Sequence, residues 1–221
     1  MTPPEEAVLR EQAVTAIRRL DALGLNRGST GNLSLRCARG GRPGLLITPT
    51  GMGADDLRAQ DMVWMGEDGI VEGDWLPSSE WHFHRAVLQR RADVQAVVHT
   101  HSVHATALAC LERPLPPFHY MVAVAGVSTV PCTPYHTFGS EALSLAVADA
   151  LQDGNACLMA HHGLVAAAPS LAQAMKITIE IESLCEVYLK ALAVGEPTLL
   201  SEAQMAEVLH KFKGYGRSRR A

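Results

Sequence analysis

The segment Ala96-Val-Val-His-Thr-His-Ser-Val-His104 is the most informative stretch of this chain. Its apolar run, residues 96–98, is typical of a buried strand. Residues i and i+2 of a strand point to the same side, so His99 and His101 are expected to place two imidazoles on one face. Catalytic zinc sites take three protein ligands and keep a fourth position open. The segment therefore predicts a strand that supplies two ligands of such a site.

The third ligand can come from the tandem pair His161 and His162, which follows a second apolar run at residues 156–160. A single histidine at the end of a strand is more often a structural or surface residue. Two histidine groups that each end an apolar run favour metal binding over that interpretation.

A second His-x-His pattern, His82 and His84, has a different context. It follows Pro77-Ser-Ser-Glu80, which has the serines and the acid typical of a helix start. Residues i and i+2 of a helix diverge by about 200°, so these two side chains cannot easily share one metal. We interpret His82 and His84 as structural residues.

The bulk properties indicate one globular domain, residues 1–221. The chain is 48% hydrophobic and has a formal net charge of −4, and its length suffices to bury a full core. The negative charge does not favour a nucleic-acid partner, and the basic run at residues 217–220 is interpreted as a solvated tail. No apolar stretch reaches the roughly 18 to 20 residues of a membrane span.

The cysteines and the N-terminus predict a cytoplasmic location. The five cysteines are scattered, odd in number and without CxxC spacing, which is typical of free thiols in a reducing compartment. The start, Met1-Thr-Pro-Pro-Glu-Glu6, has neither the basic nor the apolar region of a signal peptide.

Hydrophobic periodicity predicts an α/β architecture in which helices cover the faces of a mixed sheet. Helical spacing occurs at residues 3–23, 103–111, 141–151, 171–194 and 201–211, and another helix starts near Glu80. Besides the histidine strand, strands are expected after the turn at 28–34, at 45–47, at 127–130 and at 157–160, with a hairpin over 61–64 and 69–72.

Three segments of small residues can hold an anion. Gly28-Ser-Thr-Gly-Asn32 and Thr48-Pro-Thr-Gly51 allow close approach of backbone N–H groups, although the first is neither a Walker A loop nor GxGxxG. The third, Ser78-Ser79, lies at a helix N-terminus, where N–H groups and the helix dipole favour a phosphate. One such segment is usually a turn or a cap, but three together indicate phosphate binding.

Glu80 follows the two serines and has two interpretations. It can merely complement the helix dipole, or it can act as a general base close to the metal.

Taken together, these residues resemble the class II aldolase/adducin family, in order and over almost the whole chain. The matching segments are Gly31-Asn-Leu-Ser34, Ile47-Thr-Pro-Thr-Gly51, Pro77-Ser-Ser-Glu80, Val98-His-Thr-His-Ser-Val-His104, His119-Tyr-Met121, Pro134-Tyr135, Thr137-Phe-Gly139, His161-His-Gly-Leu164 and Lys211-Phe-Lys-Gly-Tyr-Gly216. The connection at residues 38–44 is longer than is common in the family and is interpreted as a loop insertion. The resemblance implies a largely antiparallel sheet with helices on both faces.

The resemblance also implies the roles of individual residues. One Zn²⁺ per subunit would be held by His99, His101 and His162, and Glu80 would be the acid/base. Tyr120 would reach the active site of a neighbouring subunit in a fourfold homotetramer with sites between subunits, and Tyr215 in the tail would assist. The substrate phosphate would be held by Ser29, Asn32, Thr50, Gly51, Ser78 and Ser79.

The implied activity is that of a lyase that reversibly cleaves a ketose 1-phosphate into dihydroxyacetone phosphate and a short aldehyde such as L-lactaldehyde. Zn²⁺ would stabilise an enediolate as a Lewis acid, Glu80 would exchange the proton at the reacting carbon, and Tyr120 would protonate the aldehyde oxygen during condensation. L-fuculose 1-phosphate is the first candidate substrate, and a 5-deoxy-pentulose 1-phosphate is the second.

Three alternatives stay within the same family. A sugar-phosphate 4-epimerase uses the same retro-aldol logic, but that branch has Asp where this chain has Glu80. A decarboxylase of a 3-oxo-tetronate 4-phosphate retains the Glu. A non-enzymatic adducin-like module would be expected to lose metal ligands, whereas all three histidines and Glu80 are present here.

Overall fold

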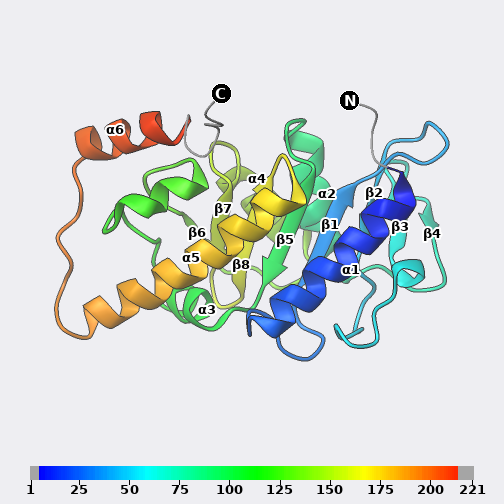
Figure 1. The fold of residues 1–221 in the computed structure, drawn as a ribbon, viewed down its shortest axis with the longest axis horizontal. Helices are drawn as coiled ribbons and strands as arrows, with labels where there is room; N and C mark the ends of the chain where they lie inside the picture. Colours follow the sequence, from blue (N-terminus) through cyan, green and yellow to red (C-terminus); the bar gives the residue numbers. More distant parts are fainter. Residues whose placement is uncertain (1–4, 214–221) are drawn as a thin grey trace, which may run out of the picture.

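The computed structural model describes residues 5–213. Within that range eight strands form one sheet in the order β4-β3-β2-β1-β5-β8-β7-β6 (Figure 1). All neighbouring pairs are antiparallel except β6 and β7, which are parallel. The strands are β1 (Asn32–Arg36), β2 (Gly44–Ile47), β3 (Val63–Gly66), β4 (Val71–Glu72), β5 (Ala96–Thr100), β6 (Cys132–Thr133), β7 (Ala156–Met159) and β8 (Gly163–Ala168). The predicted mixed, largely antiparallel sheet is confirmed.

Helices cover both faces of this sheet, as predicted. Helices α1 (Glu6–Ala22), α3 (Val103–Cys110) and α5 (Leu171–Leu192) pack on one face, and α2 (Trp81–Arg90) and α4 (Glu141–Ala150) pack on the other. Strand β5 shows the alternation that divides the core, because Val98 faces the first group of helices and Val97 faces the second. No helix among residues 5–213 has the length and apolarity needed to cross a membrane.

The remaining helical elements lie beyond this sandwich. The 3₁₀ helix η1 (Ala59–Asp61) precedes β3, and η2 (Tyr120–Ala125) packs against α5 and against the last helix, α6 (Glu202–Phe212). Ser201 caps α6, since its hydroxyl oxygen accepts from the backbone N–H of Gln204 at 3.2 Å.

Two sequence predictions differ from the structure. Residues 127–130 form no strand; only Val130 pairs, in an isolated bridge with Leu115, and the strand β6 begins at Cys132. These apolar residues are irregular because no neighbouring strand offers them a ladder. Strand β8 was not predicted, since an alanine-rich run becomes a strand here only through its pairing with β5 and β7.

The connection at residues 38–44, interpreted above as a loop insertion, is itself a small hairpin. Arg39 and Arg42 pair across Gly40 and Gly41, which have φ of +58° and +79°. Both arginines form ion pairs with Glu72 on β4, and both guanidinium groups lie over the ring of Trp64. The hairpin is therefore anchored to the edge of the sheet far from the histidines.

Candidate active site

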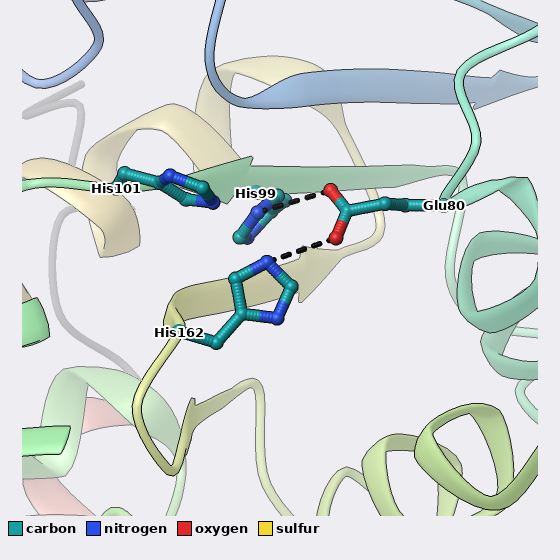
Figure 2. A group of neighbouring side chains, drawn as sticks. All are labelled: Glu80, His99, His101 and His162. Carbon is teal, nitrogen blue, oxygen red and sulfur yellow. Dashed lines mark ion pairs between the residues drawn. The ribbon is translucent and has the colours of Figure 1, made fainter. Parts of the chain in front are cut away.

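The histidines and Glu80 meet where strand β5 ends. His99 lies on β5, His101 is the first residue beyond it, His162 lies in the turn between β7 and β8, and Glu80 immediately precedes α2. One nitrogen or oxygen atom from each of these side chains lies within 4.8 Å of the others. Figure 2 shows all four side chains pointing toward one centre. The expectation that His99 and His101 share a face is met.

The turn between β7 and β8 selects which member of the tandem pair enters the cluster. His161 has a φ of +55°, in the left-handed region that few residues other than glycine adopt. Its side chain points outward and donates or accepts a hydrogen bond with Glu112 at 2.9 Å. His162 instead places its Nε2 atom 2.8 Å from Oε1 of Glu80.

The imidazoles of His99 and His101 direct nitrogen atoms into the cluster. A carbonyl oxygen only accepts, so Nδ1 of His99 donates to the backbone oxygen of Leu164 at 2.9 Å and its Nε2 presents a lone pair to the cluster. The Nε2 atoms of His99 and His101 are buried and form no hydrogen bond with any described residue. Burial, together with the nearby His99 and His162, lowers the pKa of His101 to about 4. Buried, unshared lone pairs of this kind fit a metal ion.

Glu80 faces the histidines as a carboxylate. Burial alone would raise its pKa, but the attraction of His99 and the hydrogen bond from His162 outweigh it and hold the pKa well below its usual range. Oε2 of Glu80 lies 3.2 Å from Nε2 of His99 and accepts a 2.8 Å hydrogen bond from Nδ2 of Asn32. Glu80 occupies the N-cap of α2, and its side chain caps no backbone N–H; its carboxylate instead contacts His99, His162 and Asn32.

A cleft of about 360 Å³ opens beside this cluster. The same cleft is lined by all three small-residue segments that were expected to hold an anion, and no lysine or arginine is among its described lining residues. The six residues predicted to bind phosphate all line it, namely Ser29, Asn32, Thr50, Gly51, Ser78 and Ser79. An anion in this cleft would therefore be bound by uncharged hydrogen-bond donors rather than by a lysine or arginine.

Backbone pairing brings two of the three segments together. Pro49 and Pro77 form a bridge, the backbone N–H of Ser78 donates to the oxygen of Thr48 at 3.0 Å, and that of Thr50 donates to the oxygen of Leu76 at 3.0 Å. The N-terminus of α2 follows directly and adds its positive dipole end to this side of the cleft.

Three further residues line the cleft that the sequence patterns left without a role, namely Tyr135, His136 and Phe138; His161, the other member of the tandem pair, lines it too. The rings of Tyr135 and His161 meet edge to face at 5.9 Å, and Phe138 is 66% exposed. The signal was present in the sequence, because Tyr135 and Phe138 lie in segments that match the family.

The two tyrosines with predicted roles lie elsewhere. Tyr120 begins η2, is 50% exposed and does not line the cleft of its own chain. Tyr215 lies outside the described residues. A larger groove of about 990 Å³ runs between α1 and α5, but it contains no histidine and lies apart from the cluster.

The fold and this site together define a class of protein. A sequence model of the family described as "Class II Aldolase and Adducin N-terminal domain" matches residues 11–189. The chain belongs to this family.

Individual relatives make the resemblance more specific. The chain is 46% identical over 214 residues to a "5-methylthioribulose-1-phosphate/5-deoxyribulose-1-phosphate aldolase" of Rhodospirillum rubrum, covering 97% of this chain and 95% of the relative. It is 44% identical over 213 residues to an "L-fuculose phosphate aldolase" of Escherichia coli, covering 96% of this chain and 97% of the relative. A solved structure of "L-fuculose 1-phosphate aldolase" superposes with a TM-score of 0.88 at 37% identity, covering 92% of this chain and 95% of the other. These likenesses confirm the predicted family and the predicted enzyme class, a metal-dependent lyase.

Proposed function

We propose that this chain is a zinc-dependent aldolase that reversibly cleaves a ketose 1-phosphate into dihydroxyacetone phosphate and a short aldehyde. One observation carries the proposal: the cluster of histidines and Glu80 and the three small-residue segments expected to bind an anion line the same cleft. A carbonyl and a phosphate of one small molecule can therefore be held at the same time. Both relatives compared above are named for ketose 1-phosphates or sugar phosphates of this kind.

His99, His101 and His162 would hold the metal. The proposal is supported by the buried Nε2 atoms of His99 and His101, which have no hydrogen-bond partner among the described residues, and by the tautomer that Leu164 imposes on His99. Nitrogen ligands of this type suit zinc. When bound, the metal supplies a Lewis acid that polarises the substrate carbonyl and acidifies the neighbouring carbon.

Glu80 would act as the acid/base at that carbon. Its lowered pKa keeps it ionised at neutral pH and ready to accept a proton. In condensation it would remove a proton from the hydroxymethyl carbon of dihydroxyacetone phosphate, and after cleavage it would return one. The N–H of Asn32 holds one carboxylate oxygen in place at 2.8 Å while this occurs.

The three small-residue segments would bind the phosphate through uncharged hydrogen-bond donors. Hydroxyls of Ser29, Thr50, Ser78 and Ser79 and the amide of Asn32 surround the cleft. Gly51 has no Cβ atom and no atom lies within 4 Å of where one would be, so an anion can approach the main chain there. The N-terminus of α2 would add to the attraction.

Tyr120 would act in a neighbouring subunit of a homotetramer, with the sites between subunits. The proposal is supported by the exposure of Tyr120 and by its absence from the described lining of its own cleft. In cleavage it would accept the proton of the hydroxyl that becomes the aldehyde, with Tyr215 assisting.

A cytoplasmic location is part of the proposal. All five cysteines are free thiols. Burial raises the pKa of Cys157 and Cys185, which keeps these two thiols protonated and unreactive. This pattern is typical of a protein kept in a reducing compartment.

The decisive experiment measures release of dihydroxyacetone phosphate by the zinc-loaded protein from L-fuculose 1-phosphate and from 5-deoxyribulose 1-phosphate, each with and without a strong chelator. Release that the chelator abolishes supports the proposal, and the ratio of kcat/KM values identifies the preferred aldehyde. No release from either substrate would refute it and would direct attention to decarboxylation of a 3-oxo-tetronate 4-phosphate.

A further inference from the structure

His84, which the sequence analysis treated as structural, takes part in a buried chain of hydrogen bonds that ends on Glu80. Oγ of Ser34 lies 2.8 Å from Nδ1 of His84, Nε2 of His84 lies 2.5 Å from Oδ1 of Asn32, and Nδ2 of Asn32 lies 2.8 Å from Oε2 of Glu80. Ser34 and His84 have no exposed surface, and Asn32 and Glu80 are 5% and 7% exposed. The contact between Ser34 and His84 is therefore closed to solvent, and the contacts of Asn32 are largely buried beside the cleft.

Two regular spacings create the chain. Asn32 and Ser34 are i and i+2 on β1 and so face the same side of the sheet. Glu80 and His84 are i and i+4 at the start of α2 and so lie one helical turn apart. The helix thereby presents a carboxylate to Asn32 and an imidazole to both strand residues.

The donor and acceptor of each hydrogen bond can be assigned in turn, starting from the carboxylate of Glu80. An ionised carboxylate only accepts, so Asn32 must turn its amide nitrogen toward Glu80 and its oxygen toward His84. That oxygen needs a donor, so Nε2 of His84 carries the ring proton. Burial lowers the pKa of His84 to about 3, and Nδ1 of the neutral ring then accepts from the hydroxyl of Ser34.

With the ring proton of His84 on Nε2, the opposite orientation of the Asn32 amide conflicts with both neighbours. Rotation by 180° would place the amide oxygen against the carboxylate of Glu80 and the amide nitrogen against the N–H of His84. One contact would place an acceptor against an acceptor, and the other would place a donor against a donor. In the observed orientation one amide N–H serves Glu80, and the other remains for an anion in the cleft that Asn32 also lines.

We propose that His84 is a positioning residue of this site, which holds the Asn32 amide so that its N–H groups serve Glu80 and the substrate phosphate. The inference rests on the proposed function for its catalytic meaning, but the hydrogen-bond pattern itself is independent of any substrate. His84 does not line the cleft and is not one of the four residues of the metal-type cluster, so it would act through Asn32.

The first test is spectroscopic and uses the wild-type protein. Two-bond ¹⁵N–¹H NMR spectra of protein labelled in histidine distinguish the two neutral tautomers of each ring. The inference requires His84 to carry its proton on Nε2, and a proton on Nδ1 would overturn it. This measurement does not depend on turnover, so it tests the hydrogen-bond assignment even if the wild type cleaves no ketose 1-phosphate.

The second test compares variants of α2. His84→Gln keeps an N–H near the position of Nε2, whereas His84→Phe keeps the ring shape and removes the donor. We expect kcat/KM of His84→Phe to fall roughly 5- to 150-fold, and that of His84→Gln to stay within a few-fold of wild type, with equal bound zinc in both. The matched control is His82→Phe on the same helix, where the ring stacks on Trp81 at 3.7 Å, and it should leave kcat/KM unchanged.

A double-mutant cycle tests whether His84 acts through Asn32. In an Asn32→Ala background, His84→Phe should cause little further loss of kcat/KM, because the residue it positions is gone. Additive losses, or a His84→Gln variant as impaired as His84→Phe, would show that His84 serves only the core and would refute the proposal.

Discussion

Replacing Glu80 with glutamine tests the acid/base assignment more directly than any other change. Both carboxylate oxygens contact histidines, at 3.2 Å to His99 and 2.8 Å to His162, and Oε2 also accepts from Asn32 at 2.8 Å. Glutamine has nearly the same shape, and its amide oxygen can still accept from Asn32. It cannot take a proton from carbon at neutral pH.

The expected loss can be stated from this geometry. A positioned general base contributes roughly 10²- to 10⁴-fold to a rate, which corresponds to about 2.7–5.4 kcal/mol of transition-state stabilisation. The three histidines are untouched, so bound zinc should remain at one per chain. We therefore expect kcat to fall by at least about a hundredfold while KM changes little.

The assay combines three measurements on Glu80→Gln. Steady-state release of dihydroxyacetone phosphate gives kcat and KM, elemental analysis gives the zinc content, and exchange of deuterium from D₂O into dihydroxyacetone phosphate isolates the proton-transfer step. The matched control is Glu112→Gln, because Glu112 pairs with His161 but is largely exposed and does not line the cleft. If Glu80→Gln keeps a kcat within about threefold of wild type, the assignment of Glu80 is wrong.

Three other changes probe different parts of the structure. His99→Ala should remove bound zinc and activity together, because it deletes a buried nitrogen of the cluster, and unchanged zinc content by elemental analysis would mean that the ligands are misassigned. Burial lowers the pKa of His84 in the folded protein to about 3 from an ordinary 6.5, so below pH 6.5 protons bind the unfolded chain preferentially. The free energy of unfolding of the metal-free protein should therefore fall by about 2 kcal/mol between pH 7 and pH 5 because of this group. Urea titrations at both pH values should show a smaller fall for His84→Gln than for wild type. Gly163→Ala would place a Cβ atom 2.4 Å from the backbone oxygen of Thr100, so thermal unfolding should show a loss of about 1–3 kcal/mol, whereas Gly195→Ala, which meets no atom within 4 Å, should leave Tm unchanged.

Local patterns in the sequence were sufficient for much of the site. The two-residue spacing of His99 and His101 at the end of an apolar run placed both imidazoles on one face, because side-chain direction on a strand alternates independently of the rest of the fold. Helix α6 was likewise predictable, since Ser201 caps it through contacts within three residues. Local patterns also singled out the pair His161 and His162, Glu80 and the three small-residue segments. The family resemblance selected His162 and implied the individual roles, and these residues lie together in the structure.

Other features depended on partners that are distant in the chain. The apolar residues 127–130 have strand-like composition but no strand beside them, whereas the alanine-rich β8 is a strand because β5 and β7 flank it. Apolar character indicates burial, but it does not indicate which backbone supplies the hydrogen bonds.

The meaning of His84 illustrates the same limit. Its sequence context predicted a helical residue with a structural role, and only that much was determined by the sequence alone. Only the tertiary structure places β1 against that helix, so that Ser34 and Asn32 contact the two nitrogens of the ring. Asn32 in turn forms a hydrogen bond with Glu80. Spacing along a strand or helix determines which side chains share a face, but the identity of the opposing face follows from packing between segments about 50 residues apart.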